Sequence, residues 1–423
     1  MAPTAAARSF SSFGQRYTGR SGIVALMEDL GSALRANPQM IMMGGGTPAR
    51  IPAVEQVFRN HLQAIAADSE RAYAMLGRYQ GPRGDSDVRE CIAALLRREY
   101  GWAVSAANIA VTNGGQSAFS ILANMLAGAH ADGTPRVIRF PLVPEYIGYT
   151  DVGVSEPFFR SSKPLIEQLP DKLFKYRVDF AQLQIEDDVA ALCVSRPTNP
   201  SGNMLGADEL LRLDAMARAR GIPLIIDAAY GAPFPGIEFD APEAYWSDNV
   251  ILMLSLSKLG LPGLRSGFLV ASEAFVQAFA TANTILNLAS GNVGPTLLTS
   301  LLRSGELLPL CRTQIQPWYR DRLALALDCL RAALGELPFS IHRAEGAFFL
   351  WLWFRDLPGG STRLYTELKA AGVLVIPGDT CFPGLSADWD HAHQCVRLSY
   401  AVDAERLRAA ATIIGRVAHA LYA

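Results

Sequence analysis

The stretch VILMLSLSKLGLPGLR, residues 250–265, passes from an apolar run directly into hydroxyls, a lysine and an arginine. Residues 250–254 carry no polar side chain, which is typical of a strand buried on both faces of a mostly parallel sheet. In open α/β sheets, ligands bind at the carboxyl ends of the strands, where Lys258 would lie. Desolvation lowers the pKa of a lysine and makes its amine a nucleophile. The stretch therefore predicts an α/β fold with a reactive lysine at a strand end; the alternative is a lysine that reaches solvent.

Similar apolar runs alternate with helical patterns through the middle of the chain. Further strands are expected at residues 109–112, 136–140, 190–195 and 223–226, and helices at 22–34, 85–98, 116–126 and 210–220. After about Gly305 the pattern changes to a helix at 315–334, a strand at 347–353, a helix at 362–371 and a last helix from Asp403. We expect an N-terminal arm and helix over 1–50 that join a smaller α+β domain over 301–423. The large domain, with a mostly parallel sheet flanked by helices, is expected over 51–300.

The overall composition excludes several classes of partner. The chain has 423 residues and a formal net charge of −2, which argues against nucleic acid or an anionic membrane as a partner. The densest apolar stretch, residues 347–354, is far shorter than the about 20 residues that cross a bilayer. Residues 1–10 lack the apolar core of a secretory signal. We therefore expect a cytoplasmic protein with no nucleic-acid and no membrane partner.

Cysteines and lysines are few and scattered. The six cysteines form no C-x-x-C pair, which favours isolated buried thiols in a reducing compartment. One H-x-H, at residues 391–393 near Cys395, has no second cluster of ligands, so no metal site is expected. Besides Lys258 there are four lysines, all in polar or surface-patterned segments without a partner motif: Lys163, Lys172, Lys175 and Lys369.

Three other predicted strand ends carry polar residues. In TNGGQS, residues 112–117, two glycines precede a helix whose free N–H groups favour an anion such as a phosphate. In SRPTNPSG, residues 195–202, Asn199 offers an amide donor above the sheet. Asp227 ends an apolar strand just before Tyr230, and a buried carboxylate needs a cation or a proton donor. The structural alternatives are simple turns at the first two ends and a helix cap or ion pair at Asp227.

Together, the four strand ends match the requirements of pyridoxal 5′-phosphate. Its phosphate needs N–H donors, hydroxyls and an arginine, its aldehyde needs a lysine, and its pyridine nitrogen needs a carboxylate. The glycine-rich motifs of nicotinamide and nucleotide-triphosphate sites are absent from the sequence. The sequence therefore predicts pyridoxal phosphate as the cofactor.

These motifs, in this order, resemble a known family. N-P-x-G at 199–202, D-x-x-Y at 227–230, S-x-S-K at 255–258 and then Arg265 look like the class I aminotransferases of the PLP-dependent transferase fold type I. The resemblance runs from about Gly22 to the C-terminus. It is closest to the valine–pyruvate branch, at residues 144–149, 195–199, 255–263 and 345–353.

The resemblance implies how the cofactor would be held. Lys258 would form the internal Schiff base, and Asp227 would keep the pyridine nitrogen protonated. Asn199 and Tyr230 would hydrogen-bond the 3′ oxygen, and Tyr146 would stack on the ring. The residues around the phosphate would be Gly114, Gly115, Gln116, Ser255, Ser257 and Arg265.

The resemblance also implies residues that meet the substrate and a second subunit. Arg397 would clamp the α-carboxylate of the substrate, a task that suits the fork of a guanidinium. Gly46 and Asn199 would also lie beside the substrate. Tyr79 would reach a phosphate in the neighbouring subunit, which implies a homodimer with shared active sites.

The substrate side chain is predicted from an absence of charge. No charged residue occurs over residues 274–302, where dicarboxylate-specific relatives tend to supply a second cation. This absence favours small apolar side chains, and the resemblance to the valine–pyruvate branch implies the reaction of L-valine plus pyruvate to 3-methyl-2-oxobutanoate plus L-alanine, with overlap toward other small aliphatic amino and keto acids. Two alternatives stay open: another class I PLP enzyme, with a different amino-acid preference or a lyase activity, and a non-catalytic PLP regulator. The alternating aromatics Phe348, Phe349, Trp351 and Trp353 are expected mainly in the core.

Overall fold

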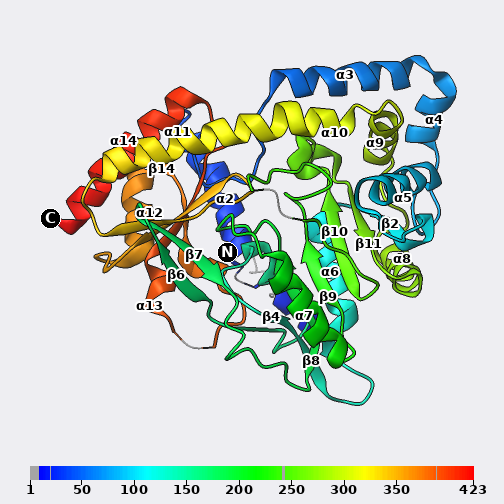
Figure 1. Cartoon of the computed structure of the whole chain (residues 1–423), viewed down its shortest axis with the longest axis horizontal. Coiled ribbons are helices and arrows are strands. Elements are labelled where there is room, and N and C mark those ends of the chain that lie inside the picture. The colour runs from blue at the N-terminus through cyan, green and yellow to red at the C-terminus, as the bar shows by residue number, and fades with distance from the viewer. Residues whose placement is uncertain (1–8, 20, 241–242, 387) are drawn as a thin grey trace, which may run out of the picture.

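A large, mostly parallel sheet forms one half of the molecule (Figure 1). The computed structural model describes residues 9–19, 21–240, 243–386 and 388–423. The strand order is β2-β11-β10-β9-β8-β4-β3, and β5 pairs with β4. Each strand is parallel to the next in the series β10, β9, β8, β4 and β5. By contrast, β11 is antiparallel to both β10 and β2, and β3 is antiparallel to β4. The strands are β2 (Ile109–Thr112), β3 (Gly128–Ala129), β4 (Pro135–Phe140), β5 (Phe159–Ser161), β8 (Val189–Ser195), β9 (Leu224–Asp227), β10 (Val250–Ser255) and β11 (Gly267–Val270).

Both faces of this sheet are buried, as the charge-free strand sequences predict. Along β8, Leu192 and Val194 belong to one hydrophobic core, while Ala191 and Cys193 belong to the other. The period of two along a strand sends successive side chains to opposite faces. The first core is covered by α3 (Pro52–Ala67), α5 (Ser86–Tyr100), α7 (Ala207–Ala219) and α9 (Val293–Arg303). The second is covered by α6 (Gly115–Leu126) and α8 (Glu273–Asn287).

A second sheet of six strands has the order β15-β16-β13-β12-β7-β6. Its strands are β6 (Leu165–Leu169), β7 (Leu173–Arg177), β12 (Phe339–His342), β13 (Phe349–Phe354), β15 (Ile376–Pro377) and β16 (Cys395–Ser399). Beside it lie α11 (Gln316–Leu334), α12 (Gly360–Ala370) and α14 (Ala404–Tyr422) (Figure 1).

The second sheet differs from the sequence expectation at one point. The hairpin of β6 and β7 comes from within the range predicted as the large domain, yet β7 pairs in parallel with β12. Local sequence favours a hairpin there but carries no signal for its partner strand, because that pairing joins residues far apart in the chain. The division into 1–50, 51–300 and 301–423 otherwise stays a prediction.

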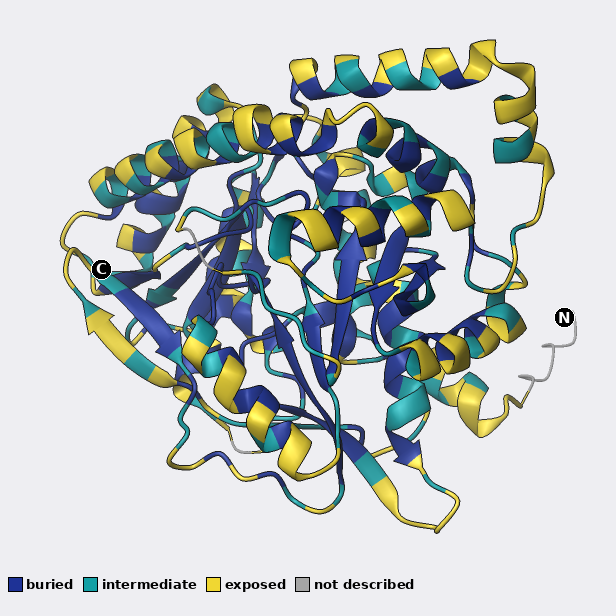
Figure 2. Cartoon of the chain, turned by 45° about the vertical axis from the view of Figure 1, so that its right-hand side comes forward, coloured by how far each residue is buried: buried dark blue, intermediate teal, exposed yellow. Residues whose placement is uncertain are grey.

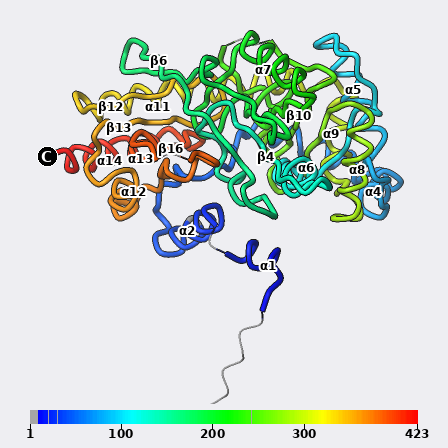
Figure 3. The backbone as a smooth tube through the Cα atoms, turned by 90° about the horizontal axis from the view of Figure 1, so that it is seen from below, coloured from blue at the N-terminus to red at the C-terminus, as the bar shows by residue number. Residues whose placement is uncertain are grey.

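The N-terminal arm lies outside the main body and is connected to the C-terminal part (Figure 3). It holds α1 (Ser12–Tyr17) and α2 (Gly22–Ala36) and continues into β1 (Ile41–Met42), which pairs with β14 (Val373–Leu374). Lys369 on α12 makes an ion pair with Asp29 on α2. Residues 1–8 and 20 of the predicted arm lie outside the described residues.

The predicted helices and strands are confirmed to within a few residues at their ends. Asp403 accepts a hydrogen bond from the Arg406 backbone N–H at the start of α14, and Gly101 ends α5 in the left-handed region with φ +68. The remaining elements are α4 (Ser69–Gly77), α10 (Leu307–Leu310), α13 (Asp390–His393), five 3-10 turns and a π-helical turn: η1 (Ala106–Asn108), η2 (Ile147–Tyr149), η3 (Ser257–Leu259), η4 (Pro262–Leu264), η6 (Gly378–Cys381) and η5 (Cys311–Ile315).

Most strands of the two sheets are buried, whereas β6 and the outward sides of many helices are exposed (Figure 2). Phe348, Phe349 and Trp351 are fully buried and Trp353 is half-buried, so the expectation of core packing is confirmed. All six cysteines are free; four are buried, and Cys91 and Cys329 are half-buried. In the described part of the chain, no helix combines the length and apolar character needed to span a membrane. The same residues contain no cluster of three His, Cys, Asp or Glu side chains that could hold a metal ion.

Candidate active site

A cavity of about 310 Å³ lies where β8, β9 and β10 of the large sheet end and β16 of the second sheet approaches them. It brings together most of the predicted site residues: Gly46, Gly115, Gln116, Tyr146, Asn199, Asp227, Tyr230, Ser255, Ser257, Lys258, Arg265 and Arg397. Gly114 does not line the cavity but lies directly behind Arg265. Tyr79 is not part of this cavity; its side chain is 84% exposed.

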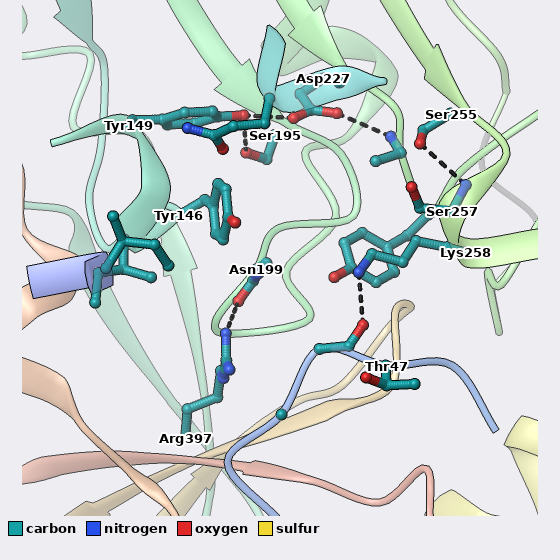
Figure 4. Close-up of a pocket in the computed structure, with 18 of the residues that line it drawn as sticks. Thr47, Tyr146, Tyr149, Ser195, Asn199, Asp227, Ser255, Ser257, Lys258 and Arg397 are labelled. Carbon is teal, nitrogen blue, oxygen red and sulfur yellow. Dashed lines mark hydrogen bonds between the residues drawn. The ribbon is translucent and has the colours of Figure 1, made fainter. Parts of the chain in front are cut away.

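Lys258 projects into the cavity from the turn that follows β10 (Figure 4). Its Nζ donates a hydrogen bond of 2.6 Å to the carbonyl oxygen of Gly46. Burial and the nearby charge of Arg397 lower the pKa of the amine and Asp227 acts in the opposite direction, which together leave the pKa at about 8. The structure thus places the Lys258 amine in the cavity, and its role as the reactive amine stays a prediction.

Asp227 ends β9 and is held by two donors. The Tyr149 hydroxyl donates to its Oδ2 at 2.5 Å, and the Ala229 backbone N–H donates to its Oδ1 at 2.9 Å. Burial raises the pKa of the carboxyl, while these two hydrogen bonds and the charge of Lys258 lower it. Asp227 thus accepts hydrogen bonds from a hydroxyl and an N–H group. The cation that acts on it is Lys258, not an arginine.

An anion-binding arrangement surrounds the N-terminus of α6. Gly114 precedes the helix with φ +88, and a Cβ at this position would lie 2.6 Å from Nη2 of Arg265. Glycine therefore allows the guanidinium to approach the backbone, and the helix end adds free N–H groups. Arg265 Nη1 lies 3.5 Å from the Ser257 hydroxyl, and Ser255 Oγ accepts from the Ser257 N–H at 3.1 Å.

Arg397 enters the cavity from β16 and connects the two halves of the site. Its Nη1 donates to Asn199 Oδ1 at 2.6 Å, and its Nη2 donates to the Gly44 carbonyl oxygen at 2.7 Å. The guanidinium is buried, its carbon lies 4.3 Å from the centre of the Phe349 ring, and its Nε has no partner. Within the described residues, no carboxylate lies within ion-pair distance of it. A buried arginine with only neutral partners and a spare N–H is suited to an incoming anion.

Two predicted aromatic residues form walls of the cavity. The ring of Tyr146 contacts that of Tyr149 edge-on, with centroids 5.4 Å apart. The ring of Tyr230 lies 5.3 Å from Lys258 Nζ and packs edge-on against Phe348. Burial raises the pKa of both tyrosines, so both hydroxyls keep their protons at neutral pH.

The sequence interpretation missed several residues that line the cavity. Tyr149 and Ser195 lie beside Asp227, and Thr47 follows Gly46. Tyr149 and Ser195 fall in stretches that carry the family resemblance, so that resemblance was the available signal. The apolar wall of Ile23, Leu26 and Met27 comes from α2, whose periodicity predicts a helix but not its position over the cavity.

One further expectation, about Lys175, is wrong. Lys175 on β7 is fully buried and makes an ion pair with Glu345, instead of lying at a solvated surface without a partner. Its Nζ also donates to Asn203 Oδ1 at 3.1 Å and to the Met204 carbonyl oxygen at 3.0 Å. Alternating polar residues along β6 and β7 suggest exposure, but the pairing of β7 with β12 covers this position.

Comparisons with known proteins agree with this geometry. Residues 53–414 match the family model described as aminotransferase class I and II. Valine–pyruvate aminotransferase of Escherichia coli K12 is 46% identical over 406 residues, which cover 96% of this chain and 97% of that protein.

Two solved structures are similar to the chain over nearly its whole length. A putative amino-acid aminotransferase from Psychrobacter arcticum superposes with a TM-score of 0.95 at 40% identity, covering 98% of this chain and 99% of that one. A valine–pyruvate aminotransferase from Salmonella typhimurium superposes with a TM-score of 0.87 at 43% identity, covering 95% and 99%.

Proposed function

The chain belongs to the class I and II aminotransferases, and from that membership we propose that it exchanges the amino group between L-valine and pyruvate. The products would be 3-methyl-2-oxobutanoate and L-alanine. The observation that carries the proposal is the meeting of three groups in one cavity: the half-buried Lys258 amine, the half-buried Asp227 carboxyl and the buried Arg397 guanidinium.

The donor set fits pyridoxal phosphate, the cofactor of this family. Pyridoxal phosphate, when bound, supplies an electrophilic carbonyl and a ring that accepts the electrons left when the substrate Cα loses its proton. The fit is supported by the half-buried amine of Lys258, the half-buried carboxyl of Asp227 and the close approach of Arg265 to Gly114. A cavity without an anion cradle or without a carboxyl near the amine would not suit this group.

We assign the cofactor contacts as follows. Asp227 would hold the proton on the pyridine nitrogen, Lys258 would bind the aldehyde carbon, and Tyr146 would pack against the ring. Asn199 and Tyr230 would bind the phenolic oxygen. The residues that would bind the phosphate group, at the N-terminus of α6 and around the turn after β10, are Gly114, Gly115, Gln116, Ser255, Ser257 and Arg265.

The chain's own residues also bind the substrate and move its proton. Arg397 binds the α-carboxylate, using N–H groups that Asn199 and Gly44 leave free. Once the substrate amine has displaced Lys258, its freed Nζ would take the proton from Cα and return it, a role that a depressed pKa supports. Gly46 leaves room beside this amine, since a Cβ at its position would lie 3.4 Å from Nζ.

A preference for a small aliphatic side chain is supported by the apolar wall of the cavity. Ile23, Leu26, Met27 and Ile147 line it, and no charged residue occurs over residues 274–302. A hydrophobic pocket separates side chains that differ by one methylene by only about 1–3 kcal/mol. We therefore expect valine to be preferred over other aliphatic amino acids only by a modest factor.

Incubation with valine alone tests the reaction class. An aminotransferase releases one keto acid per active site and then stops until pyruvate is added, whereas a lyase releases keto acid and ammonia continuously. Lys258→Ala should abolish turnover of valine with pyruvate, measured as alanine formation without any added amine. Retained turnover in this variant would refute the proposed role of Lys258.

We further propose a homodimer in which Tyr79 reaches the phosphate site of the second subunit. Tyr79 is strongly exposed, as are the large apolar side chains of Tyr73, Leu76, Ile285, Leu286 and Leu288. This surface adjoins the anion cradle, because the Gly291 N–H donates to Asn113 Oδ1 and Asn292 Nδ2 donates to the Ala74 carbonyl oxygen. Exposed apolar surface of this kind is typical of a subunit interface.

Mixing two inactive variants tests the shared site. Refolding Tyr79→Ala together with Lys258→Ala should restore one intact site per mixed dimer, so that activity rises above that of either parent. Activity equal to the average of the parents would contradict a shared site.

We also propose a cytoplasmic location, which the free cysteines and the likeness to bacterial metabolic enzymes support.

A further inference from the structure

Asp227 at the cavity is connected through the hydroxyls of Tyr149 and Ser195 to Glu145, a buried carboxyl group that does not line the cavity; Figure 4 shows Asp227, Tyr149 and Ser195. The Tyr149 hydroxyl contacts Asp227 Oδ2 at 2.5 Å and lies 3.5 Å from Ser195 Oγ. Ser195 Oγ in turn hydrogen-bonds Glu145 Oε2, and the Ser195 N–H donates to Glu145 Oε1 at 2.9 Å. Glu145, Ser195, Tyr149 and Asp227 thus form one chain of contacts, which ends at the proposed partner of the pyridine nitrogen.

Counting hydrogens along this chain gives different results for the two states of Glu145. If Glu145 is ionised, the Ser195 hydroxyl donates to it and the Tyr149 hydroxyl donates to Asp227, so no hydrogen remains for the contact between the two hydroxyls. If Glu145 is protonated, its O–H donates to Ser195, Ser195 donates to Tyr149, and Tyr149 donates to Asp227. Every contact then has one hydrogen, and all of them point toward Asp227.

The surroundings of Glu145 also favour the protonated form. Glu145 is fully buried, and among the described residues no lysine or arginine forms an ion pair with it. The pKa of its carboxyl is raised to about 8: burial and the charge of Asp227 raise it, and they outweigh the hydrogen bonds from Ser195 and from the Tyr146 N–H, which lower it. Cys193 and Cys381 are the other titratable groups nearby, and burial raises the pKa of both thiols, so neither supplies a charge.

We propose that Glu145 is a positioning residue that carries a proton and orients the hydroxyls of Ser195 and Tyr149 toward Asp227. This rests on the proposed function, since the oriented hydroxyls keep the negative charge on Asp227, where a pyridine nitrogen needs it. A carboxylic acid matches the observed contacts, because its carbonyl oxygen accepts the Ser195 N–H while its O–H faces Ser195 Oγ. The alternative is an ionised Glu145 that only ties β8 to the preceding loop.

Infrared spectroscopy tests the protonation state without the cofactor. The spectrum of the protein stripped of cofactor should contain the carbonyl stretch of a buried carboxylic acid, shifted in heavy water and lost in Glu145→Gln. Glu345→Gln is the matched control, because Glu345 is also buried but pairs with Lys175, so this substitution should leave the acid band unchanged. An acid band that persists in Glu145→Gln would overturn the proposal.

Cofactor affinity tests the orienting role. Glutamine reproduces the protonated acid, since its amide oxygen accepts and its N–H donates, so Glu145→Gln should bind pyridoxal phosphate within about two-fold of the parent. Glu145→Ala and Ser195→Ala break the chain and should weaken binding about ten-fold, as expected for loss of an oriented bond to a charged group. Binding is measured by absorbance titration.

Each outcome has a distinct meaning. Glu145→Gln as weak as Glu145→Ala would refute the orienting role, because an ionised acceptor would then be required. If Glu145→Gln fails to fold, Ser195→Ala and the infrared band of the parent protein with labelled glutamate decide the question. A parent protein that binds no pyridoxal phosphate would refute the proposed function, while its infrared band would still report on Glu145.

Discussion

Replacing Arg397 by lysine should selectively weaken the productive binding of the amino-acid carboxylate. Two N–H groups of Arg397 are already used by Asn199 Oδ1 and the Gly44 carbonyl oxygen, at 2.6 and 2.7 Å. The remaining N–H groups, including the unpaired Nε, are free for a carboxylate. A lysine ammonium has fewer hydrogens and cannot satisfy both protein oxygens and a carboxylate fork together.

The expected loss follows from this count. At least one hydrogen bond to a charged group disappears, and such a bond contributes about 1.5–3 kcal/mol. This corresponds to a decrease of roughly 10- to 150-fold in kcat/KM. Because the α-carboxylate is bound in both ground state and transition state, most of the change should appear in KM.

The assay measures alanine formation at varied valine and pyruvate concentrations, together with binding of a carboxylate that lacks an amino group. Arg139→Lys is the matched control, since Arg139 is also a buried arginine but lies on β4 outside the cavity. Arg139→Lys should lower stability without changing KM. If Arg397→Lys changed kcat/KM by less than about three-fold, or no more than the control, the assignment of the substrate carboxylate to Arg397 would be refuted.

Three further predictions concern the cradle, the lysine and the buried ion pair. Gly114→Ala should weaken the binding of pyridoxal phosphate at least about ten-fold in absorbance titrations. The reason is that the new Cβ would lie 2.6 Å from Arg265, at a backbone φ of +88. Gly101→Ala is the control, and unchanged affinity in Gly114→Ala would contradict this prediction. In the cofactor-free folded protein, the pKa of Lys258 is about 8, below the ordinary 10.5. Between these two pH values the unfolded chain binds more protons than the folded one. The free energy of unfolding should therefore rise with pH over this range. Urea titrations should show that Lys258→Met removes this rise, and an identical pH dependence would contradict the depressed pKa. Lys175→Met should cost about 3–5 kcal/mol in urea unfolding, because buried Glu345 loses its near partner and keeps only the exposed Arg343, whose Nε lies 3.9 Å from Glu345 Oε1. A loss below about 1 kcal/mol would contradict the burial of a charged pair.

The main secondary-structure elements were predictable because their signals are local. Residues 109–112, 250–254 and their counterparts contain few or no charges, and a strand buried on both faces tolerates little else. The helix ends followed from residues such as Gly101, which adopts φ +68 after α5. The cavity residues at strand ends were predictable for a related reason, since parallel strands end at the same edge of a sheet and bring their polar residues together.

Other residues had no local signal for their role. Tyr149 and Glu145 read as ordinary members of a loop before a short turn, and only their contacts with Asp227 and Ser195 give them a chemical context. Lys175 was expected at a surface because its strand alternates polar and apolar residues. Its burial results from the pairing of β7 with β12, which no local pattern encodes.

By itself, the sequence determined the class of fold and the residues at the strand ends, and it singled out Lys258 as the predicted reactive amine. Those properties depend on the order of residues along one strand and its following turn. The tertiary structure alone decided which groups from the two sheets meet, such as Arg397 with Asn199, and which donors surround Asp227. Such contacts join residues up to about two hundred positions apart, so they depend on the packing of whole elements and on the burial that shifts the pKa of each group.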